Sequence, residues 1–402
     1  MRVAVGQFGA PTPVVNASLC GVIQGLVQKK NVEIYAVLGG PTGLACGKFI
    51  EIDPSTIDFE LLRQTPGAAL LAGRRADFRE VDERAVDALC EKGIDALIVI
   101  GGNGTMSMAQ DLFNIAKSKS VDLQVVGVPK TIDNDIVGID HTPGFPSAAQ
   151  FVLQALRDLS IDLEAMVGFE QVRVVEVMGR NTGWLAATAF LLSEIDDIVP
   201  VICIPELDLN LDNILTEIQM NVKTNGRALV VVSEGVRTSE GEHLVQISGY
   251  KTKSSNHVLG GIGRLLASEI IDELGFGVRY ENLGLLQRCW ADCQVPLDVK
   301  EATELGYLAA SAVIEGKSGV MATLLRKSST PYQTNYTFIP FISIANQERK
   351  VEQQWLPLSN EFREWLRPLI NWDKLKPHFR LESILSRKGM YVDAFGHVEH
   401  FE

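Results

Sequence analysis

The sequence predicts an α/β protein with mainly parallel β-sheets, and two observations support this class. Short runs of β-branched residues alternate with longer segments of helical periodicity from the beginning of the chain. The runs are apolar and are bounded by glycine, proline or polar residues, which is typical of strands buried on both faces of a parallel sheet. Hydrophobic residues make up 46% of the 402 residues and charged residues 22%, so apolar side chains for a core are plentiful.

This alternation assigns the elements in order. The predicted strands are Val3–Val5, Ala96–Ile100, Val125–Val128, Val172–Val177, Val201–Ile204 and Ala228–Val232. The predicted helices are Asn16–Val27, Asp82–Glu91, Thr105–Ala116, Ser147–Leu159, Thr182–Leu192, Leu211–Val222 and Gly260–Leu274. Such an order favours right-handed crossovers between parallel strands. At about 150 residues per domain the length indicates roughly two to three domains, although no linker-like stretch or internal repeat separates them.

The last part of the chain has a different composition. From Pro331 onward it carries many charges and several aromatic residues, including Trp355, Trp365 and Trp372. Helical periodicity is confined to Ser359–Ile370. A segment of this kind rarely folds alone, so we expect a C-terminal extension packed over the rest of the molecule rather than a separate domain.

The charge balance excludes a general nucleic-acid binder. The formal net charge is −13, from 37 basic and 50 acidic residues, whereas a nucleic-acid partner requires a basic surface. An anionic ligand would therefore be held by a few local arginines, lysines and backbone amides.

The cysteine usage and the absence of a long apolar run predict a cytoplasmic protein. Six cysteines are scattered, and only Cys289 and Cys293 lie close together, without the further ligands of a zinc site. Free thiols fit a reducing compartment. The first residues run straight into a strand, so no signal peptide is expected. The apolar run Trp184–Leu192 is shorter than the ~20 residues of a membrane-spanning helix, so no membrane association is expected.

Two glycine-rich loops follow predicted strands. One runs over 6–12 after the first strand, and the other comprises Gly101-Gly102-Asn103-Gly104-Thr105. Each precedes a predicted helix, whose N-terminal amides together with the glycine backbone can bind phosphate. A tight turn without a ligand is the alternative. The second loop approximates a dinucleotide-binding fingerprint, but nothing else in the unit supports one, and a Walker-type loop is absent.

A third loop carries more chemistry. Pro129-Lys130-Thr131-Ile132-Asp133-Asn134-Asp135 follows a predicted strand and places two carboxylates beside a lysine and a threonine. Such a group can provide a general base and a cation for a migrating phosphoryl group. An Asx-turn cluster is an alternative. A calcium loop is excluded because Gly144 stands where the closing glutamate is required.

Further loops add arginines and a carboxylate. Met178-Gly179-Arg180 and Ser233-Glu234-Gly235 follow two later strands, and Arg279 and Arg288 flank another strand. Arginines at these places suit bidentate contacts with a phosphate, and Glu234 suits sugar hydroxyls. Surface caps and ion pairs are the alternative interpretation.

Taken together and in this order, these segments resemble the phosphofructokinase family over about Val3 to Arg326. The decisive segments are the 101–105 loop, the specific 129–135 motif, and Val175-Glu176-Val177-Met178-Gly179-Arg180. The resemblance implies two similar Rossmann-like lobes with the active site in the cleft between them. We expect a donor lobe of 1–144 with about 255–310, a fructose 6-phosphate lobe of 145–254 with about 311–330, and a 331–402 extension packed on the second lobe.

The resemblance also implies an activity and its residues. The family transfers a phosphoryl group from ATP or pyrophosphate, with Mg²⁺, to the 1-hydroxyl of fructose 6-phosphate. Asp133 would take the hydroxyl proton, with Lys130 beside it. The acceptor would contact Thr131, Ile132, Asp133, Asp135, Met178, Gly179, Arg180, Glu234, Arg279 and Arg288. The donor would contact Gly9, Ala10, Arg74, Arg75, Gly102, Asn103, Gly104 and Thr105, with the metal at Asn103. Arg279 would reach a neighbouring subunit, which implies a homodimer or homotetramer.

Two positions bear on the donor. Glycine at Gly104 is typical of family members that use ATP, because a side chain there would obstruct the nucleoside. Lysine at Lys130 is typical of members that use pyrophosphate. We expect ATP because steric exclusion is harder to overcome than an extra cation, and pyrophosphate is the alternative.

Several residues depart from the family pattern at the site. Asn103 stands where the magnesium-associated aspartate usually lies, and Ala10 replaces a glycine. Gln171 aligns with an arginine that crosses to the neighbouring active site, and Leu285 with a histidine near the sugar. These departures leave open a regulatory paralogue that binds sugar phosphate or nucleotide with weakened catalysis.

Two further departures bear on regulation. Cys20 and Gln24 stand where allosteric bacterial members carry effector-binding arginines. Control by ADP or phosphoenolpyruvate of the usual bacterial kind is therefore not expected.

Overall fold

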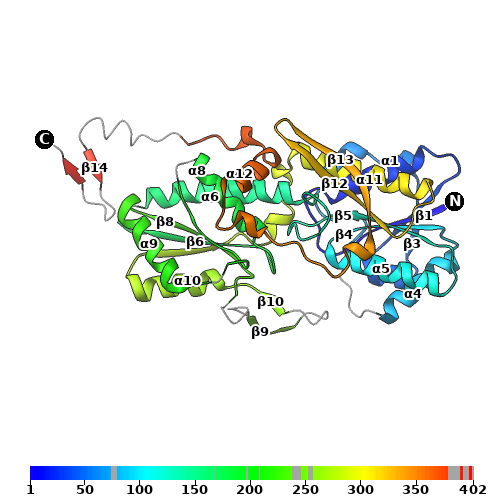
Figure 1. Ribbon diagram of the computed structural model, residues 1–402, viewed down its shortest axis with the longest axis horizontal. Helices are drawn as coiled ribbons and strands as arrows, with labels where there is room; N and C mark the ends of the chain where they lie inside the picture. Colours follow the sequence, from blue (N-terminus) through cyan, green and yellow to red (C-terminus); the bar gives the residue numbers. More distant parts are fainter. Residues whose placement is uncertain are drawn as a thin grey trace.

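The computed structural model describes residues 1–73, 79–166, 168–195, 198–207, 209–237, 246–251, 257–378, 390–392 and 398–400. Within these ranges the chain forms two sheets of mainly parallel strands, each covered by helices, and they lie side by side along the long axis (Figure 1). The predicted α/β class is confirmed.

The first lobe is built on the sheet β13-β12-β5-β4-β1-β2-β3. Its strands are β1 Arg2–Gln7, β2 Glu33–Val37, β3 Phe49–Ile52, β4 Ala96–Gly101, β5 Gln124–Pro129, β12 Val320–Ser329 and β13 Tyr332–Pro340. The inner pairs are parallel, and β3 and β13 are antiparallel to their neighbours. Helices α1 Val15–Val27 and α11 Pro296–Ile314 cover one face, while α4 Arg79–Lys92 and α5 Asn103–Ser118 cover the other (Figure 1). Shorter helices α2 and α3 span Gly40–Ala45 and Phe59–Gln64.

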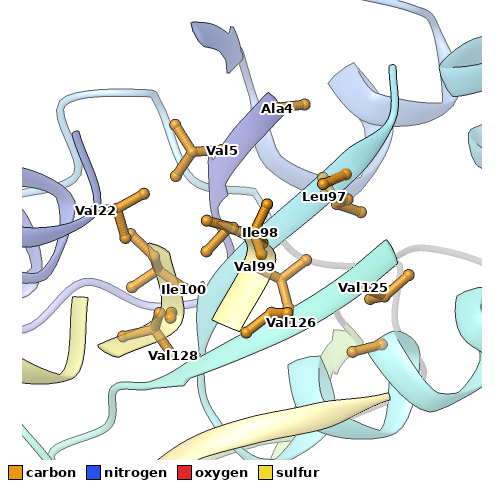
Figure 2. Packing of buried hydrophobic residues seen from close by; sticks show 14 of the residues in the cluster. Ala4, Val5, Val22, Leu97, Ile98, Val99, Ile100, Val125, Val126 and Val128 are labelled. Carbon is orange, nitrogen blue, oxygen red and sulfur yellow. The ribbon is translucent and has the colours of Figure 1, made fainter. Parts of the chain in front are cut away.

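Continuous β-branched runs account for the buried position of the central strands. The side chains of β4 from Ala96 to Ile100 are fully buried, and those of Val125, Val126 and Val128 on β5 pack beside them (Figure 2). Each strand therefore contributes apolar side chains to both faces of the sheet, as the sequence predicts.

Helices α1 and α11 pack closely because small residues face each other. A β-carbon at Gly21 would lie 2.0 Å from the carbonyl oxygen of Thr303, and one at Gly306 would lie 2.3 Å from that of Ser18. Only glycine fits at both positions, so the approach of these helices is fixed by the sequence.

The second lobe is built on the parallel sheet β11-β6-β8-β7. Its strands are β6 Val172–Val177, β7 Val201–Cys203, β8 Ala228–Ser233 and β11 Val278–Asn282. Alternate residues of β6 face opposite cores: Val175 and Val177 pack with α6 Phe145–Ala165, whereas Val172 and Val174 pack with α9 Leu211–Asn225 and α10 Ile262–Leu274. A separate antiparallel pair joins β9 Gln246–Lys251 and β10 His257–Leu259.

One predicted helix is broken. The span Thr182–Leu192 forms α7 Trp184–Ala187, a 3-10 turn over Thr188–Leu191 and α8 Leu192–Ile195. The Thr188 hydroxyl donates a hydrogen bond to the Leu185 carbonyl at 2.6 Å, and such a bond favours the tighter turn over a regular helix.

The strand pairings correct the expected division of the chain between the lobes. Strand β11 lies beside β6 in the second lobe, and β12 lies beside β5 in the first. The cause is apolar burial: Val278 and Tyr280 pack against the core of the second sheet, while Met321 and Leu324 are fully buried in that of the first. Of the segment 255–310, helix α11 packs on the first lobe as expected.

The C-terminal extension joins both lobes. Strand β13 completes the first sheet, and α12 Asn360–Leu366 then packs against α7 in the second lobe. The ring of Trp365 lies 5.2 Å from that of Trp184 and 5.9 Å from that of Phe145. Figure 1 shows α12 above α6. The Arg326 guanidinium of β12 donates to the Trp365 carbonyl at 2.7 Å, so α12 also contacts the first lobe. Farther along, β14 Met390–Val392 pairs with β15 Val398–His400.

Helices long and apolar enough to span a membrane are not found in the described ranges.

A buried carboxylate connects helix α11 to the start of α6. Asp298 accepts hydrogen bonds from the backbone amides of Gly144 and Ser147 at 2.9 and 3.1 Å and from the Ser147 hydroxyl at 2.6 Å. Burial raises the pKa of Asp298 to about 6, although these hydrogen bonds act in the opposite direction. The first turn of α6 in the second lobe is thereby fixed to the first lobe.

The variant Asp298→Ala should lower the free energy of unfolding by about 3 kcal/mol, because buried donors lose their acceptor. Denaturant unfolding measures this loss. Asp272→Ala, at an exposed position on α10, is the control and should change stability by less than about 0.5 kcal/mol. Equal losses in the two variants would contradict the role given to Asp298.

Candidate active site

The three loops singled out in the first lobe lie side by side at the carboxyl ends of β1, β4 and β5. The Phe8 amide donates to the Ile100 carbonyl at 2.8 Å, and the Lys130 amide donates to the Gly101 carbonyl at 2.9 Å. Parallel pairing of adjacent strands places their carboxyl ends at one edge, where ligands of α/β proteins bind.

Lys130 joins the third loop to the first. Its side chain is buried, and Nζ donates hydrogen bonds to the carbonyls of Phe8 and Ala10 at 2.9 and 2.6 Å. Gly9 has a φ of +75°, and its amide donates to the Gly73 carbonyl at 3.0 Å. Ala10 is not among the described non-glycine residues with a positive φ, so alanine adopts its backbone conformation there without strain. The predicted donor residues Arg74 and Arg75 lie outside the described residues.

The 101–105 loop begins helix α5. Gly102 is extended at the N-cap, and its carbonyl accepts from the amides of Thr105 and Met106 at 2.9 and 3.1 Å. A β-carbon at Gly104 would meet no atom within 4 Å, so this position borders open space. The helix N-terminus next to that space provides the partial positive charge that favours an anion.

The 129–135 loop is held rigidly by its own side chains. The Asp133 amide donates to Thr131 Oγ1 at 3.1 Å, and Asn134, at a φ of +53°, accepts from the Thr142 amide at 2.9 Å. The Thr142 hydroxyl donates to the Thr131 carbonyl at 2.8 Å. The Ile132 side chain is buried in the core of the second lobe, so an acceptor could contact only the main chain of this residue.

The second lobe brings its own loops to the same place. The Thr182 hydroxyl donates to the Asp133 carbonyl at 2.9 Å and so joins the two lobes at the expected base. Gly179 has a φ of +139°, and its carbonyl accepts from the Ser233 hydroxyl at 2.7 Å. The Met178 amide donates to Gln287 Oε1 at 3.0 Å. The loops after β6 and β8 and the turn that carries Gln287 are therefore adjacent.

Four carboxyl groups interact at this junction. Burial, and then the charge of Asp133, raises the pKa of Glu234 to about 7. Burial and the charges of Asp133 and Glu348 hold the pKa of Asp135 well above its usual range. Carboxyl groups that disfavour one another's ionisation are typical of sites that bind a proton or a cation.

The two predicted anion-binding arginines lie in different places. Arg288 ends the 3-10 turn Gly284–Arg288, next to Gln287 and hence close to Met178. Arg279 lies near the amino end of β11, at the opposite edge of the sheet, and its guanidinium pairs with Glu170 at 3.3 Å. Within one chain the structure therefore does not bring Arg279 to Asp133.

A segment that sequence reasoning missed crosses the site. We call residues Asn346–Val351 the strap. In the first lobe the Asn346 amide donates to Ser107 Oγ at 3.0 Å, and Asn103 Nδ2 donates to the Gln347 carbonyl at 2.7 Å. The Arg349 amide then donates to the Asp135 carbonyl at 2.8 Å.

The strap continues to the second lobe. Asn181 Nδ2 donates to Glu348 Oε1 at 2.8 Å, and the Val351 amide donates to Glu206 Oε1 at 3.0 Å. Glu206 also accepts from the Gly183 amide at 3.0 Å. The strap thus contacts loops from both sheets. Its polar sequence is typical of a solvated loop and gave no signal of this placement.

The residues present fit a divalent cation held together with phosphates. Asp135 Oδ1 is closed to solvent and accepts no hydrogen bond, and Asn103 lies beside the same carboxyl. In the described ranges no group of three or more His, Cys, Asp or Glu side chains forms a complete metal cage. Mg²⁺ does not require one, because it usually takes one or two carboxylates together with substrate phosphates.

Three of the four departures from the family pattern that lie in other parts of the chain occupy structural positions. Gln171 is buried, and its Oε1 accepts from the Gly277 amide at 2.7 Å, while Leu285 is exposed. Cys20 is buried in α1, and Gln24 accepts hydrogen bonds from the Arg63 guanidinium and the Tyr307 hydroxyl, both at 3.2 Å.

Comparisons with known proteins agree with this arrangement. The family model described as Phosphofructokinase matches residues 2–313. A sulfofructose kinase of Alkalicoccus urumqiensis is 37% identical over 92% of this chain and 96% of its own. An ATP-dependent 6-phosphofructokinase of Streptomyces coelicolor is 32% identical over 81% of this chain and 91% of its own.

Solved structures show the same fold. A crystal structure of a pyrophosphate-dependent phosphofructokinase from Marinobacter aquaeolei superposes with a TM-score of 0.82 at 27% identity. The match covers 94% of this chain and 95% of that one. The two-lobed architecture is therefore shared over nearly the whole length of both.

The raised pKa of Glu234 predicts a pH-dependent stability. Its carboxyl titrates near 4.5 when unfolded and near 7 when folded, so its contribution is fully present below pH 4.5 and is lost as the pH rises through 7. Glu234→Gln should therefore gain up to about 3 kcal/mol of unfolding free energy over the wild type between pH 4.5 and 8.

Thermal unfolding of the ligand-free proteins across this range measures the gain. Glu273→Gln, which removes a carboxylate from an exposed position on α10, is the charge-matched control. If the difference in stability between Glu234→Gln and the wild type stayed constant with pH, the raised pKa assigned to Glu234 would be contradicted.

Proposed function

Because this chain belongs to the phosphofructokinase family, we propose that it transfers a phosphoryl group to the 1-hydroxyl of fructose 6-phosphate. One observation carries the proposal: the Asp133 loop lies between the two glycine-rich loops of the first lobe and the Met178–Arg180 loop of the second, and Thr182 joins it to that lobe. A donor held by the first lobe and a sugar held by the second would therefore meet at Asp133.

Each element has a role in this reaction. The Asp133 carboxylate takes the proton from the 1-hydroxyl as that oxygen attacks the terminal phosphorus of ATP. The bond from this phosphorus to the bridging oxygen breaks, and ADP leaves. The amides of the 101–105 loop and of Ala10 bind the donor phosphates, Gly9 lines the same place, and Lys130 neutralises charge on the transferred group. Met178, Gly179 and Arg180 bind the sugar, and Glu234 accepts hydrogen bonds from its hydroxyls. Arg288 holds the group at carbon 6.

Mg²⁺ is the cofactor of this proposal. Asp135 and Asn103 are the residues of the first lobe that would hold it, and the bound ion neutralises charge on the donor phosphates. The unpartnered Oδ1 atom of Asp135 supports this assignment.

We propose ATP as the donor. The open space next to Gly104 would leave room for a nucleoside beyond the terminal phosphates. The buried Lys130 ammonium is bound by two carbonyl groups, so its charge is shared with the first loop. Pyrophosphate is the alternative donor, and the protein from Marinobacter aquaeolei is named as a pyrophosphate-dependent phosphofructokinase.

The residues expected near the group at carbon 6 of the sugar favour a second candidate acceptor. Gln171 and Leu285 stand where the family pattern has an arginine and a histidine, so two potential cations are missing near carbon 6. A phosphate monoester carries about −1.5 to −2 at neutral pH, whereas a sulfonate carries a single negative charge. Fewer cations suit the sulfonate, and the relative named sulfofructose kinase agrees with it. Sulfofructose is therefore the second candidate acceptor.

The location of Arg279 supports an oligomer. It lies at the edge of the second sheet away from Asp133, so it can serve a sugar site only in a neighbouring copy. We propose a homodimer or homotetramer in which Arg279 of one copy contacts the group at carbon 6 in the next.

A coupled turnover assay tests the proposal. Fructose 6-phosphate and sulfofructose are each offered with ATP and with pyrophosphate, and kcat/KM is compared across the four pairs. We expect the highest value for fructose 6-phosphate with ATP. A higher value for sulfofructose selects the second acceptor. Binding without turnover in all four pairs would indicate a regulatory paralogue, against which the retained Asp133 and Asp135 argue.

Removal of the base gives a direct prediction. Asp133→Asn should lower kcat by about 10²- to 10⁴-fold with little change in sugar affinity, because the amide cannot accept the proton. Steady-state kinetics and equilibrium sugar binding measure the two quantities. A loss of binding equal to the loss of kcat would show that Asp133 holds the sugar rather than its proton.

The donor proposal predicts a specific change of preference. Gly104→Asp should fold, because its β-carbon meets no atom and an acidic residue is favourable in the first turn of a helix. It should lower kcat/KM for ATP by about tenfold or more, while pyrophosphate use falls less. Gly104→Ala is the size control. Equal losses with both donors in Gly104→Asp would contradict the steric argument.

A further inference from the structure

The strap places a carboxylate, Glu348, next to the expected metal-binding group. The hydrogen bond from the Arg349 amide to the Asp135 carbonyl, 2.8 Å long, fixes the main chain of the strap against the 129–135 loop. Glu348 immediately precedes this contact in the chain, so its carboxylate lies beside the 129–135 loop.

One oxygen of the Asp135 carboxyl lacks the partner that a buried polar atom requires, although the group also receives a hydrogen bond from the Asn103 side chain. Its Oδ1 atom is closed to solvent and accepts no hydrogen bond, and the two charges that act on it, Asp133 and Glu348, are both negative. An unsatisfied carboxylate oxygen in such surroundings is unfavourable unless a cation or a proton is present. The geometry therefore selects a positive ligand between the 129–135 loop and the strap.

The strap also explains why residue 103 is an asparagine. Asn103 Nδ2 donates a hydrogen bond to the Gln347 carbonyl at 2.7 Å. An aspartate there would face that carbonyl without a proton to share and would add a further negative charge beside Asp135. In this chain the Asn103 side-chain amide holds the strap. A second carboxylate beside Asp135 would therefore have to come from a residue other than 103.

The Glu348 side chain is oriented from the second lobe. Asn181 Nδ2 donates to Glu348 Oε1 at 2.8 Å, and Asn181 Oδ1 accepts from the Arg237 guanidinium at 3.0 Å. Outer hydrogen bonds of this kind are what usually fix the direction of a metal-binding carboxylate.

We propose that Glu348 acts together with Asp135 as a carboxylate facing the magnesium ion of the phosphoryl donor, in place of the carboxylate that Asn103 lacks. The inference rests on the proposed function, because that function supplies the ion and the phosphates. It assigns to the C-terminal extension a direct part in metal binding, with the two carboxylates coming from segments that are far apart in the sequence.

Manganese binding provides a test that needs no turnover. Free Mn²⁺ is measured by electron paramagnetic resonance while the full-length protein is titrated in the presence of the β,γ-imido analogue of ATP, and separately of methylene diphosphonate. Glu348→Gln is the test variant, since its amide oxygen can still accept from Asn181. Glu364→Gln, which removes a carboxylate from an exposed position on α12, is the matched control.

Glu348→Gln should weaken Mn²⁺ binding by about 10- to 100-fold, the range typical of losing a residue that supports a metal site. The control should bind as the wild type does, and thermal unfolding without ligands should show that both variants are folded. Unchanged Mn²⁺ affinity in Glu348→Gln would overturn the inference, as would a loss matched by Glu364→Gln.

This test separates the inference from the proposed function. A wild-type protein that binds Mn²⁺ with either analogue but phosphorylates no hexose would refute the proposed function, and the effect of Glu348→Gln would still decide the role of Glu348.

Discussion

The arrangement of the site depends on how the 129–135 loop is held between two lobes. From the first lobe, Lys130 ties it to the glycine-rich loop after β1. From the second, the Thr182 hydroxyl reaches the Asp133 carbonyl. Asp298 fixes the start of α6, the helix that follows the loop. At the loop these contacts use the Lys130 ammonium and the Asp133 carbonyl, so they position the carboxyl groups of Asp133 and Asp135 while leaving those groups to interact with ligands and with each other.

Much of the fold and part of the site could be predicted from the sequence because the signals are local. Buried parallel strands read as continuous apolar runs, and each loop after such a strand lies at the same edge of its sheet. The loops containing Gly102, Lys130 and Met178 were found in this way. The boundary between the lobes was not, because β11 and β12 join their sheets through long-range pairing that no local pattern records.

The strap shows a second limit of sequence reasoning. Three of its contacts to the loops use its own main chain, through the amide of Arg349, the carbonyl of Gln347 and the amide of Val351. Main-chain groups are present in every residue, so they leave no trace in side-chain composition. Two of its side chains also take part: Glu348 accepts from Asn181, and the Arg349 guanidinium donates to the Asp140 carbonyl and lies over the Trp184 ring. A glutamate and an arginine in a polar segment resemble those of any solvated loop.

The connection of the strap to both lobes has a mechanical consequence. Enzymes of two lobes commonly open and close around a hinge, but here a continuous segment is fastened to both edges that would separate. Opening at the Asp133 loop would require release of the hydrogen bonds at Asp135 and Asn181 or movement of the strap with one lobe. Any separation of the lobes at the Asp133 loop is therefore restrained by a segment of the C-terminal extension, which lies far from that loop in the sequence.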